Sequence, residues 1–197
     1  MNYIESQFGN PKGIIGHLVG IVMAYENRAR NQWALSLLDI QPTDRILEIG
    51  FGPGWAIHQA SKLAYQGLVA GVDRSSAMVK QARLRNRAKV KLGQVILRHG
   101  SAAEIPFEDE TFNKIYAVNS FHEWENINDG LKEARRVLVL GGMLLIVEHP
   151  HGGLGETSLK ALGNQLREQI SSQGFQSVKI FSNSIQGRPA IGVQGVK

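Results

Sequence analysis

The sequence predicts an α/β domain built on a mostly parallel sheet that carries helices on both faces. Short and almost continuously apolar segments alternate with amphipathic segments along most of the chain, as in parallel sheets covered on both sides. A turn with glycine at alternate positions, Gly50, Gly52 and Gly54, follows the first apolar segment. The last two strand-like segments are joined by a connection too short for a parallel crossover, which predicts an antiparallel end to the sheet.

We expect seven strands with helices between them. The strands cover residues 45–49, 68–73, 95–99, 112–119, 143–148, 177–182 and 190–196. The helices cover residues 55–64, 75–87, 128–139 and 157–173, with Ser75 as an N-cap and the pair Gly141 and Gly142 closing the third of them. Before the first strand, residues 14–38 are apolar on more than one helical face, which predicts a helical cap over the sheet.

Composition limits the class of protein. A chain of 197 residues that is 43% hydrophobic suffices for one core and predicts a single domain. No apolar run approaches the ~18 residues of a membrane span, and residues 1–20 lack signal-peptide features, so we expect a cytoplasmic protein. The absence of cysteine excludes disulfides, thiolate metal sites and a cysteine nucleophile. His17, His58 and His99 lie in different elements and show no ligand spacing. His149 and His151 could face the site but have no carboxylate partner nearby in the sequence, so no metal is expected.

The positive charge is unevenly distributed. The formal net charge is +5, and between Asp73 and Glu104 the chain has no acid but eight basic residues. Such a segment is either a solvated helix face or a surface that meets nucleic acid or anionic lipid.

The glycine turn and the acid after the second strand predict a nucleoside ligand. In an open parallel sheet, ligands bind at the carboxyl ends of the strands, where a glycine turn lets the backbone approach. The dinucleotide pattern needs a third glycine where this chain has Trp55, and Pro53 removes a backbone donor, so a pyrophosphate is not favoured. Asp73, at the end of the second strand, is placed to accept hydrogen bonds from ribose hydroxyls.

Four motifs in order resemble one family, the Rossmann-like class I S-adenosylmethionine-dependent methyltransferases, in particular methyltransferase type 11. They are "LEIGFGPG", "VAGVDRSSAMV", "GSAAEIPFEDETFNKIYAVNSFHEW" and "LKEARRVLVLGGMLLIVE". The resemblance spans roughly residues 43–148. It implies S-adenosylmethionine as cofactor and S-adenosylhomocysteine as product. It also divides the single domain into an N-terminal helical cap (1–42), a cofactor-binding core (43–148) and a C-terminal helix with a β-hairpin (149–197).

The resemblance also assigns roles to residues. Gly50, Phe51, Gly52 and Gly54 would wrap the methionine part, and Glu48 would order the turn or reach the ammonium group through water. Asp73 would hold the ribose. The adenine would lie against the stem of Arg74 and near Met78. Ser101 and Ala102 stand where the family usually has an acid that accepts the adenine amino group, so this contact is in doubt. The methyl-donor end would be lined by Asn119 and Ser120.

Methyl transfer needs a base only where the acceptor must lose a proton early. His122, just after the fourth strand, is the candidate, because imidazole accepts a proton near neutral pH. The open alternative is that His122 only packs or caps locally. Glu123, Trp124 and Glu125 would shape the acceptor pocket.

The acceptor is predicted to be a small or lipophilic molecule, because no added recognition domain is apparent. The N-terminal segment, the loop after Asn119 and residues 149–156 would hold it, and the apolar cap would also suit an acceptor drawn from a membrane surface. Two alternatives stay open: an RNA methyltransferase using the basic segment, although nucleic acid is not the favoured partner, and a non-catalytic S-adenosylmethionine-binding protein. The sequence gives no oligomeric state.

Overall fold

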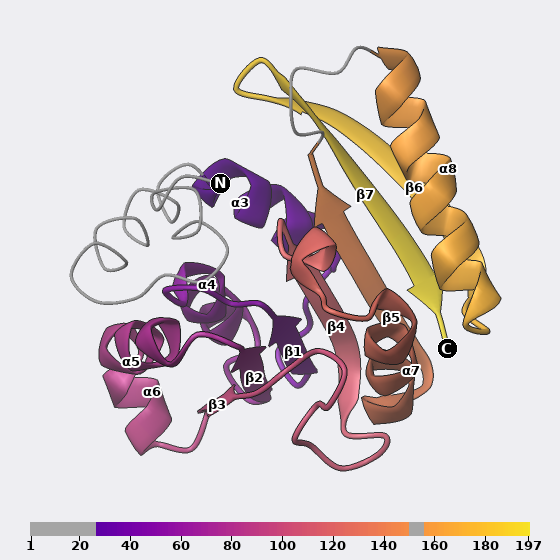
Figure 1. Ribbon diagram of the computed structural model, residues 1–197. Helices are drawn as coiled ribbons and strands as arrows, with labels where there is room; N and C mark the ends of the chain where they lie inside the picture. The colour runs from indigo at the N-terminus through magenta and orange to yellow at the C-terminus, as the bar shows by residue number, and fades with distance from the viewer. Residues whose placement is uncertain (1–26, 150–155) are drawn as a thin grey trace.

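The computed structural model describes residues 27–149 and 156–197, and in them seven strands form one sheet. The spatial order is β3-β2-β1-β4-β5-β7-β6 (Figure 1). The strands are β1 (Arg45–Ile49), β2 (Leu68–Asp73), β3 (Val95–His99), β4 (Phe112–Val118), β5 (Leu138–Glu148), β6 (Gln176–Ile185) and β7 (Arg188–Val196). Strands β1 to β5 are parallel to one another, and β7 is antiparallel to both β5 and β6. This arrangement confirms the predicted α/β class with an antiparallel last strand.

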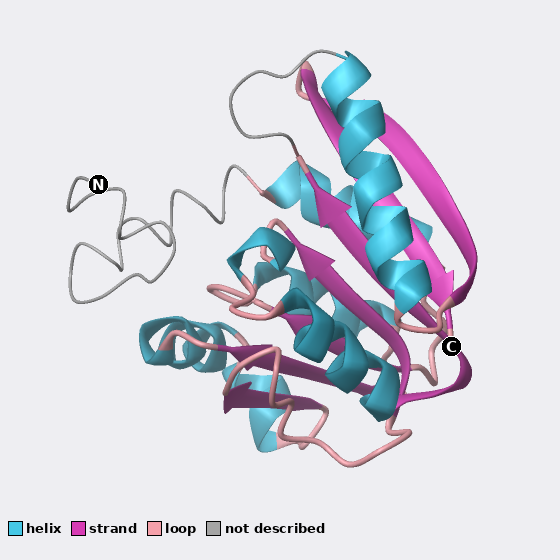
Figure 2. Ribbon diagram, turned by 45° about the vertical axis from the view of Figure 1, so that its right-hand side comes forward, coloured by secondary structure: helices cyan, strands magenta, loops and turns pink. Residues whose placement is uncertain are grey.

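Helices cover both faces of the sheet (Figures 1 and 2). One layer contains α3 (Arg28–Leu37), α4 (Trp55–Leu63), α5 (Ser76–Arg85) and α6 (Arg87–Lys91), and the other contains α7 (Ile127–Val137) and α8 (Glu156–Ser172). Alternate residues of a strand pack against the two different helix layers. Ile46 is buried on the α3–α4 side and Leu47 on the α7–α8 side, as the pleat of a strand requires. The apolar runs of the sequence are therefore strands buried on both faces.

The ligand edge of the sheet is set by the strand order. β1 pairs with β2 on one side and with β4 on the other. The strands that follow β1 are therefore added first on one side of it (β2, β3) and then on the other (β4, β5), so the strand order reverses at β1. In such sheets the crevice beside the carboxyl ends of the strands at this reversal receives ligands. The glycine turn after β1, the end of β2, and a short 3₁₀ helix η1 (Phe121–Glu123) after β4 all lie at this edge.

The junction between α7 and β5 differs from the sequence prediction. The helix ends at Val137 and the strand begins at Leu138 without a loop, so Gly141 and Gly142 lie inside β5 instead of closing the helix. The physical reason is long-range pairing: Leu138 is in register with Phe112, and the glycine pair exchanges backbone hydrogen bonds with Lys197. Partners distant in sequence thus override the usual helix-ending role of glycine.

The terminal hairpin is tighter than predicted. Its strands extend to Ile185 and start again at Arg188, which leaves a turn of Gln186 and Gly187. Both turn residues have positive φ, 53° and 74°, the conformation that two-residue hairpins favour. The predicted connection over 183–189 was therefore too long.

The helix predicted over 75–87 is interrupted. Ser75 is its N-cap, as predicted, and accepts a hydrogen bond from Met78 N at 3.4 Å. The helix ends at Arg85, and buried Asn86 donates to the carbonyls of Ala82 and Gly54 before α6 begins. In the predicted N-terminal cap, Arg28–Leu37 is helical, whereas residues 14–26 lie outside the described part of the chain.

Candidate functional site

The glycine turn after β1 brings the backbone close to the end of β4. Gly50 has a φ of 76°, and a Cβ atom there would lie 2.4 Å from Cβ of Ser120, whose hydroxyl donates to the Ile49 carbonyl at 2.8 Å. Only glycine therefore fits at position 50. Gly52 also has a positive φ, but open space surrounds the position of its missing Cβ. The turn is thus packed tightly at its start and exposes bare backbone in its middle.

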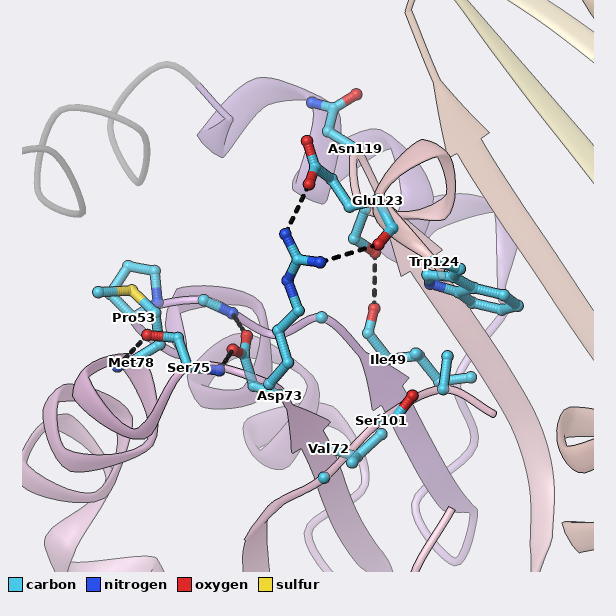
Figure 3. A pocket seen from close by; sticks show the side chains of 16 residues that line it. Ile49, Pro53, Val72, Asp73, Ser75, Met78, Ser101, Asn119, Glu123 and Trp124 are labelled. Atoms are coloured by element: carbon cyan, nitrogen blue, oxygen red, sulfur yellow. Dashed lines mark hydrogen bonds and ion pairs between the residues drawn. The ribbon is translucent and has the colours of Figure 1, made fainter. Parts of the chain in front are cut away.

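Asp73 ties this turn to the end of β2. One carboxylate oxygen accepts the N–H of Gly52 and the other accepts the N–H of Ser75, both at 2.8 Å (Figure 3). Burial raises the pKa of Asp73, and the two backbone hydrogen bonds oppose this rise. Each carboxylate oxygen has a second lone pair, so the side chain can hold the turn and still accept hydrogen bonds from a ligand.

A cavity of about 770 Å³, open to solvent, lies between the glycine turn, the end of β2 and η1. Nine of the predicted cofactor-binding residues line it: Gly50, Gly52, Asp73, Arg74, Met78, Ser101, Ala102, Asn119 and Ser120. The hydroxyl of Ser101 already accepts the N–H of Ala103 at 3.1 Å. We call this cavity the turn pocket.

Arg74 bridges one side of the turn pocket. Its guanidinium contacts the Glu123 carboxylate at 2.7 Å and the Glu123 carbonyl at 3.2 Å (Figure 3). The pair joins the end of β2 to η1, and both side chains are more than a third exposed. Such an exposed ion pair contributes little to stability, so a ligand can displace it without a large loss.

Glu48 and Phe51 lie on the other side of the turn. A smaller cavity there shares Gly50, Gly52 and Asn119 with the turn pocket. Glu48 is buried and accepts the hydroxyl of Tyr116 at 2.8 Å; burial raises the pKa of Glu48 to about 8. The Phe51 ring packs against Gly71 of β2, and Gly54 packs against Ala82 of α5. These two residues therefore support the turn, whereas Glu48 faces a space beside it.

His122 lies outside the turn pocket, on the opposite side of η1. It lines a third cavity of about 920 Å³, also open to solvent, whose other wall is α8. The Nδ1 atom of His122 is 3.0 Å from Glu148, and its Nε2 atom is 3.5 Å from Glu123. The hydrogen bond that Nδ1 donates to Glu148 raises the pKa of His122, with burial opposing it. We call this space the α8 cavity; its apolar lining comprises Phe121, Ile127, Ala161, Leu162 and Leu166.

Comparisons with known proteins agree with this geometry. Residues 47–146 match the family described as "Methyltransferase domain". A protein of Bacillus subtilis named "Uncharacterized methyltransferase YdaC" is 32% identical over 170 residues, which cover 86% of this chain and 92% of that protein. The chain belongs to the class I S-adenosylmethionine-dependent methyltransferases.

Two further relatives indicate the range of this family. The demethylmenaquinone methyltransferase of Bacillus cereus is 30% identical over 129 residues, covering 65% of this chain and 54% of that protein. A crystal structure of a SAM-dependent methyltransferase from Aquifex aeolicus has a TM-score of 0.67 at 21% identity, covering 84% of this chain and 88% of that one. The second likeness supports the fold.

The residues present fit the cofactor of this methyltransferase family, S-adenosylmethionine. Gly52 leaves a space that a side chain would fill, and Asp73 retains lone pairs toward the turn pocket. Ser101 has no charge, so the adenine amino group would find only a neutral hydroxyl or backbone acceptors there. Among the described residues, no cluster of three or more His, Asp or Glu side chains is placed to hold a metal ion.

Sequence reasoning missed two side chains of this candidate site, Glu148 and Asn27. Glu148 ends β5 and accepts both Phe121 N and His122 Nδ1; an acid at the end of a strand next to β4 was the available signal. Asn27 contacts the Asn119 side chain at 2.6 Å, and Asn119 in turn contacts His149 at 2.8 Å. No signal in the sequence pairs these residues, because they come from three separate segments.

Proposed function

We propose that this methyltransferase transfers a methyl group from S-adenosylmethionine to a small lipophilic acceptor that loses a proton during the reaction. The observation that carries the proposal is the position of His122. Its imidazole lies in the η1 wall between the turn pocket and the apolar α8 cavity, and it is held by a buried carboxylate. A proton acceptor is thus available at the border between a cofactor-sized pocket and an apolar space.

The cofactor is proposed to occupy the turn pocket. The bare backbone of Gly50 and Gly52 would lie along its methionine part, with Glu48 behind the turn, and Asp73 would accept from the ribose. The side chains of Arg74 and Met78, and the segment of Ser101 and Ala102, would surround the adenine. Asn119 and Ser120 would line the end from which the methyl group leaves. Phe51 and Gly54 would act by supporting the turn.

When bound, the cofactor supplies an activated sulfonium methyl carbon, which a nucleophile attacks in line. The protein's contribution is therefore to hold the acceptor close and aligned. Because Nδ1 of His122 donates to Glu148, Nε2 is the ring nitrogen that would accept a proton. Glu148 orients the ring in the way that a carboxylate orients the base of a catalytic triad.

A lipophilic acceptor is favoured by the lining of the α8 cavity and by the relatedness to demethylmenaquinone methyltransferases. We infer an aromatic or quinol-like hydroxyl compound as the acceptor class. The described helices include none that is long and apolar enough to cross a membrane. An RNA substrate and a purely cofactor-binding role are the competing proposals.

Two measurements test the proposal. Calorimetry should detect binding of S-adenosylhomocysteine and no binding of NAD; tighter binding of NAD would contradict the cofactor assignment. Radiolabelled methyl transfer is then measured with naphthoquinols, catechols and a short RNA. Transfer to a quinol or catechol that drops about 100-fold or more in His122→Asn supports the proposal, whereas efficient transfer to RNA alone, or an unaffected variant, contradicts it.

A further inference from the structure

The helix layer formed by α3, α4, α5 and α6 contains no acidic residue. These four helices carry nine Lys and Arg side chains and no Asp or Glu. On the opposite face of the sheet, α7 and α8 carry both signs, with Asp129, Glu133 and Glu168 among their acids. Figure 1 shows the two groups of helices on opposite sides of the sheet. The positive charge of the protein is thus concentrated on one side.

The basic side chains of this layer form one surface. Lys80 and Leu84 of α5 are four residues apart, and so are Arg87 and Lys91 of α6, so each pair lies on one face of its own helix. The end of α4 adjoins this face, because Lys89 donates to the Ser61 carbonyl. Gln94 also donates to the Ser61 carbonyl, at 3.1 Å.

The cations of α5 and α6 on this surface lie close to other positive charges. Burial and then the charge of Lys62 lower the pKa of Lys89, and burial and then Arg28 lower the pKa of Arg85. Among the described residues, neither Arg87 nor Lys91 forms an ion pair. Bringing an anionic surface close would relieve this repulsion.

Large apolar side chains project among these cations. Leu84 and Leu92 are 69% and 80% exposed, and Leu63, at the end of α4, is 46% exposed. Alternating cations and exposed leucines are typical of surfaces that lie in a lipid headgroup layer. A single-stranded RNA surface would instead offer aromatic rings for stacking, and among the described residues Tyr65 is the one large aromatic side chain that is exposed.

We propose that this surface, which we call the cationic face, docks the protein on an anionic lipid bilayer. It comprises the exposed residues Lys62, Leu63, Lys80, Leu84, Arg85, Arg87, Lys91 and Leu92. The cations attract the phosphate groups, and the leucines enter the boundary between headgroups and acyl chains. The inference does not depend on the proposed acceptor. It places α5, whose first turn contributes Met78 to the turn pocket, against the membrane.

The test is co-sedimentation of the full chain with phosphatidylcholine vesicles, with and without about 30% phosphatidylglycerol. The protein should bind the anionic vesicles and not the neutral ones. Binding should weaken strongly between about 50 mM and about 300 mM salt, because screening shortens the range of the charges.

Matched variants assign the binding to the cationic face. The triple variant Arg85→Gln, Arg87→Gln, Lys91→Gln should bind about 100-fold more weakly. The control Lys132→Gln, Arg167→Gln, Lys179→Gln removes the same charge from exposed positions elsewhere and should bind like the parent. Leu84→Ser with Leu92→Ser should lose roughly tenfold or more, whereas Leu140→Ser, which alters an 81% exposed leucine on β5, should lose nothing.

Three outcomes would overturn the proposal. The first is no binding to anionic vesicles at low salt. The second is equal loss of binding in the two charge variants, which would mean that only net charge matters. The third is tighter binding of a short single-stranded RNA than of vesicles, unchanged by the leucine substitutions, which would identify the surface as a nucleic-acid site.

Discussion

Replacing Asp73 with alanine should weaken both cofactor binding and the packing of the glycine turn. The carboxylate accepts the buried N–H groups of Gly52 and Ser75, and its free lone pairs are proposed to accept from the ribose. Losing the charge-assisted hydrogen bonds to the ligand costs about 2 kcal/mol or more, roughly a 30-fold higher Kd for S-adenosylhomocysteine. The two orphaned N–H groups should lower the free energy of unfolding by about 1–3 kcal/mol each.

Calorimetry and urea unfolding separate these two effects. Asn86→Ala is the matched control, because Asn86 is buried, donates to the Gly54 carbonyl at 3.1 Å and does not line the turn pocket. It should lower stability while leaving Kd within about threefold. Unchanged affinity in a folded Asp73→Ala protein would refute the ribose assignment. Equal loss of affinity in both variants would show that Asp73 acts only by ordering the turn.

Three further changes test the site. Gly50→Ala should lower the free energy of unfolding by at least about 1 kcal/mol more than Gly93→Ala does. Both glycines have a φ above 70°, but only an alanine at position 50 would clash with Ser120. Equal losses of stability in urea unfolding would contradict the close packing. The pKa of Glu48 is about 8 in the folded protein and near its ordinary value in the unfolded chain. The contribution of protonated Glu48 to the free energy of unfolding is therefore fully present below about pH 4.5 and is lost as the pH rises toward 8. Glu48→Gln, which cannot ionise, should flatten this decline by a few kcal/mol, and an identical pH profile would show that Glu48 is ionised in the fold. Glu148→Gln should lower the pKa of His122, since the hydrogen bond that His122 donates to the Glu148 carboxylate raises it. The rise of the methyl-transfer rate with pH should then begin at lower pH while kcat falls, and an unshifted profile would exclude Glu148 as the positioning residue.

The sequence by itself determined the local features of this protein. Near-continuous apolar runs located the central strands β1, β2 and β4, which are buried along most of their length because helices cover both faces of the sheet. The spacing of Gly50, Gly52 and Gly54, with Asp73 after the second strand, excluded a dinucleotide and indicated a ribose-containing ligand. These inferences needed only residues that lie near one another in the chain, or one strand apart.

The tertiary structure decided whatever depends on distant partners. Gly141 and Gly142 joined a strand because Lys197 and Phe112 supply its pairing, which no local propensity encodes. The same holds at the candidate site. Glu148 contacts His122, from which it is 26 positions distant in the sequence, and α8 forms one wall of an apolar cavity that the sequence did not predict. The parallel pairing of β4 with β5 brings the carboxyl ends of the two strands together. Glu148 at the end of β5 can therefore orient the imidazole of His122 after β4.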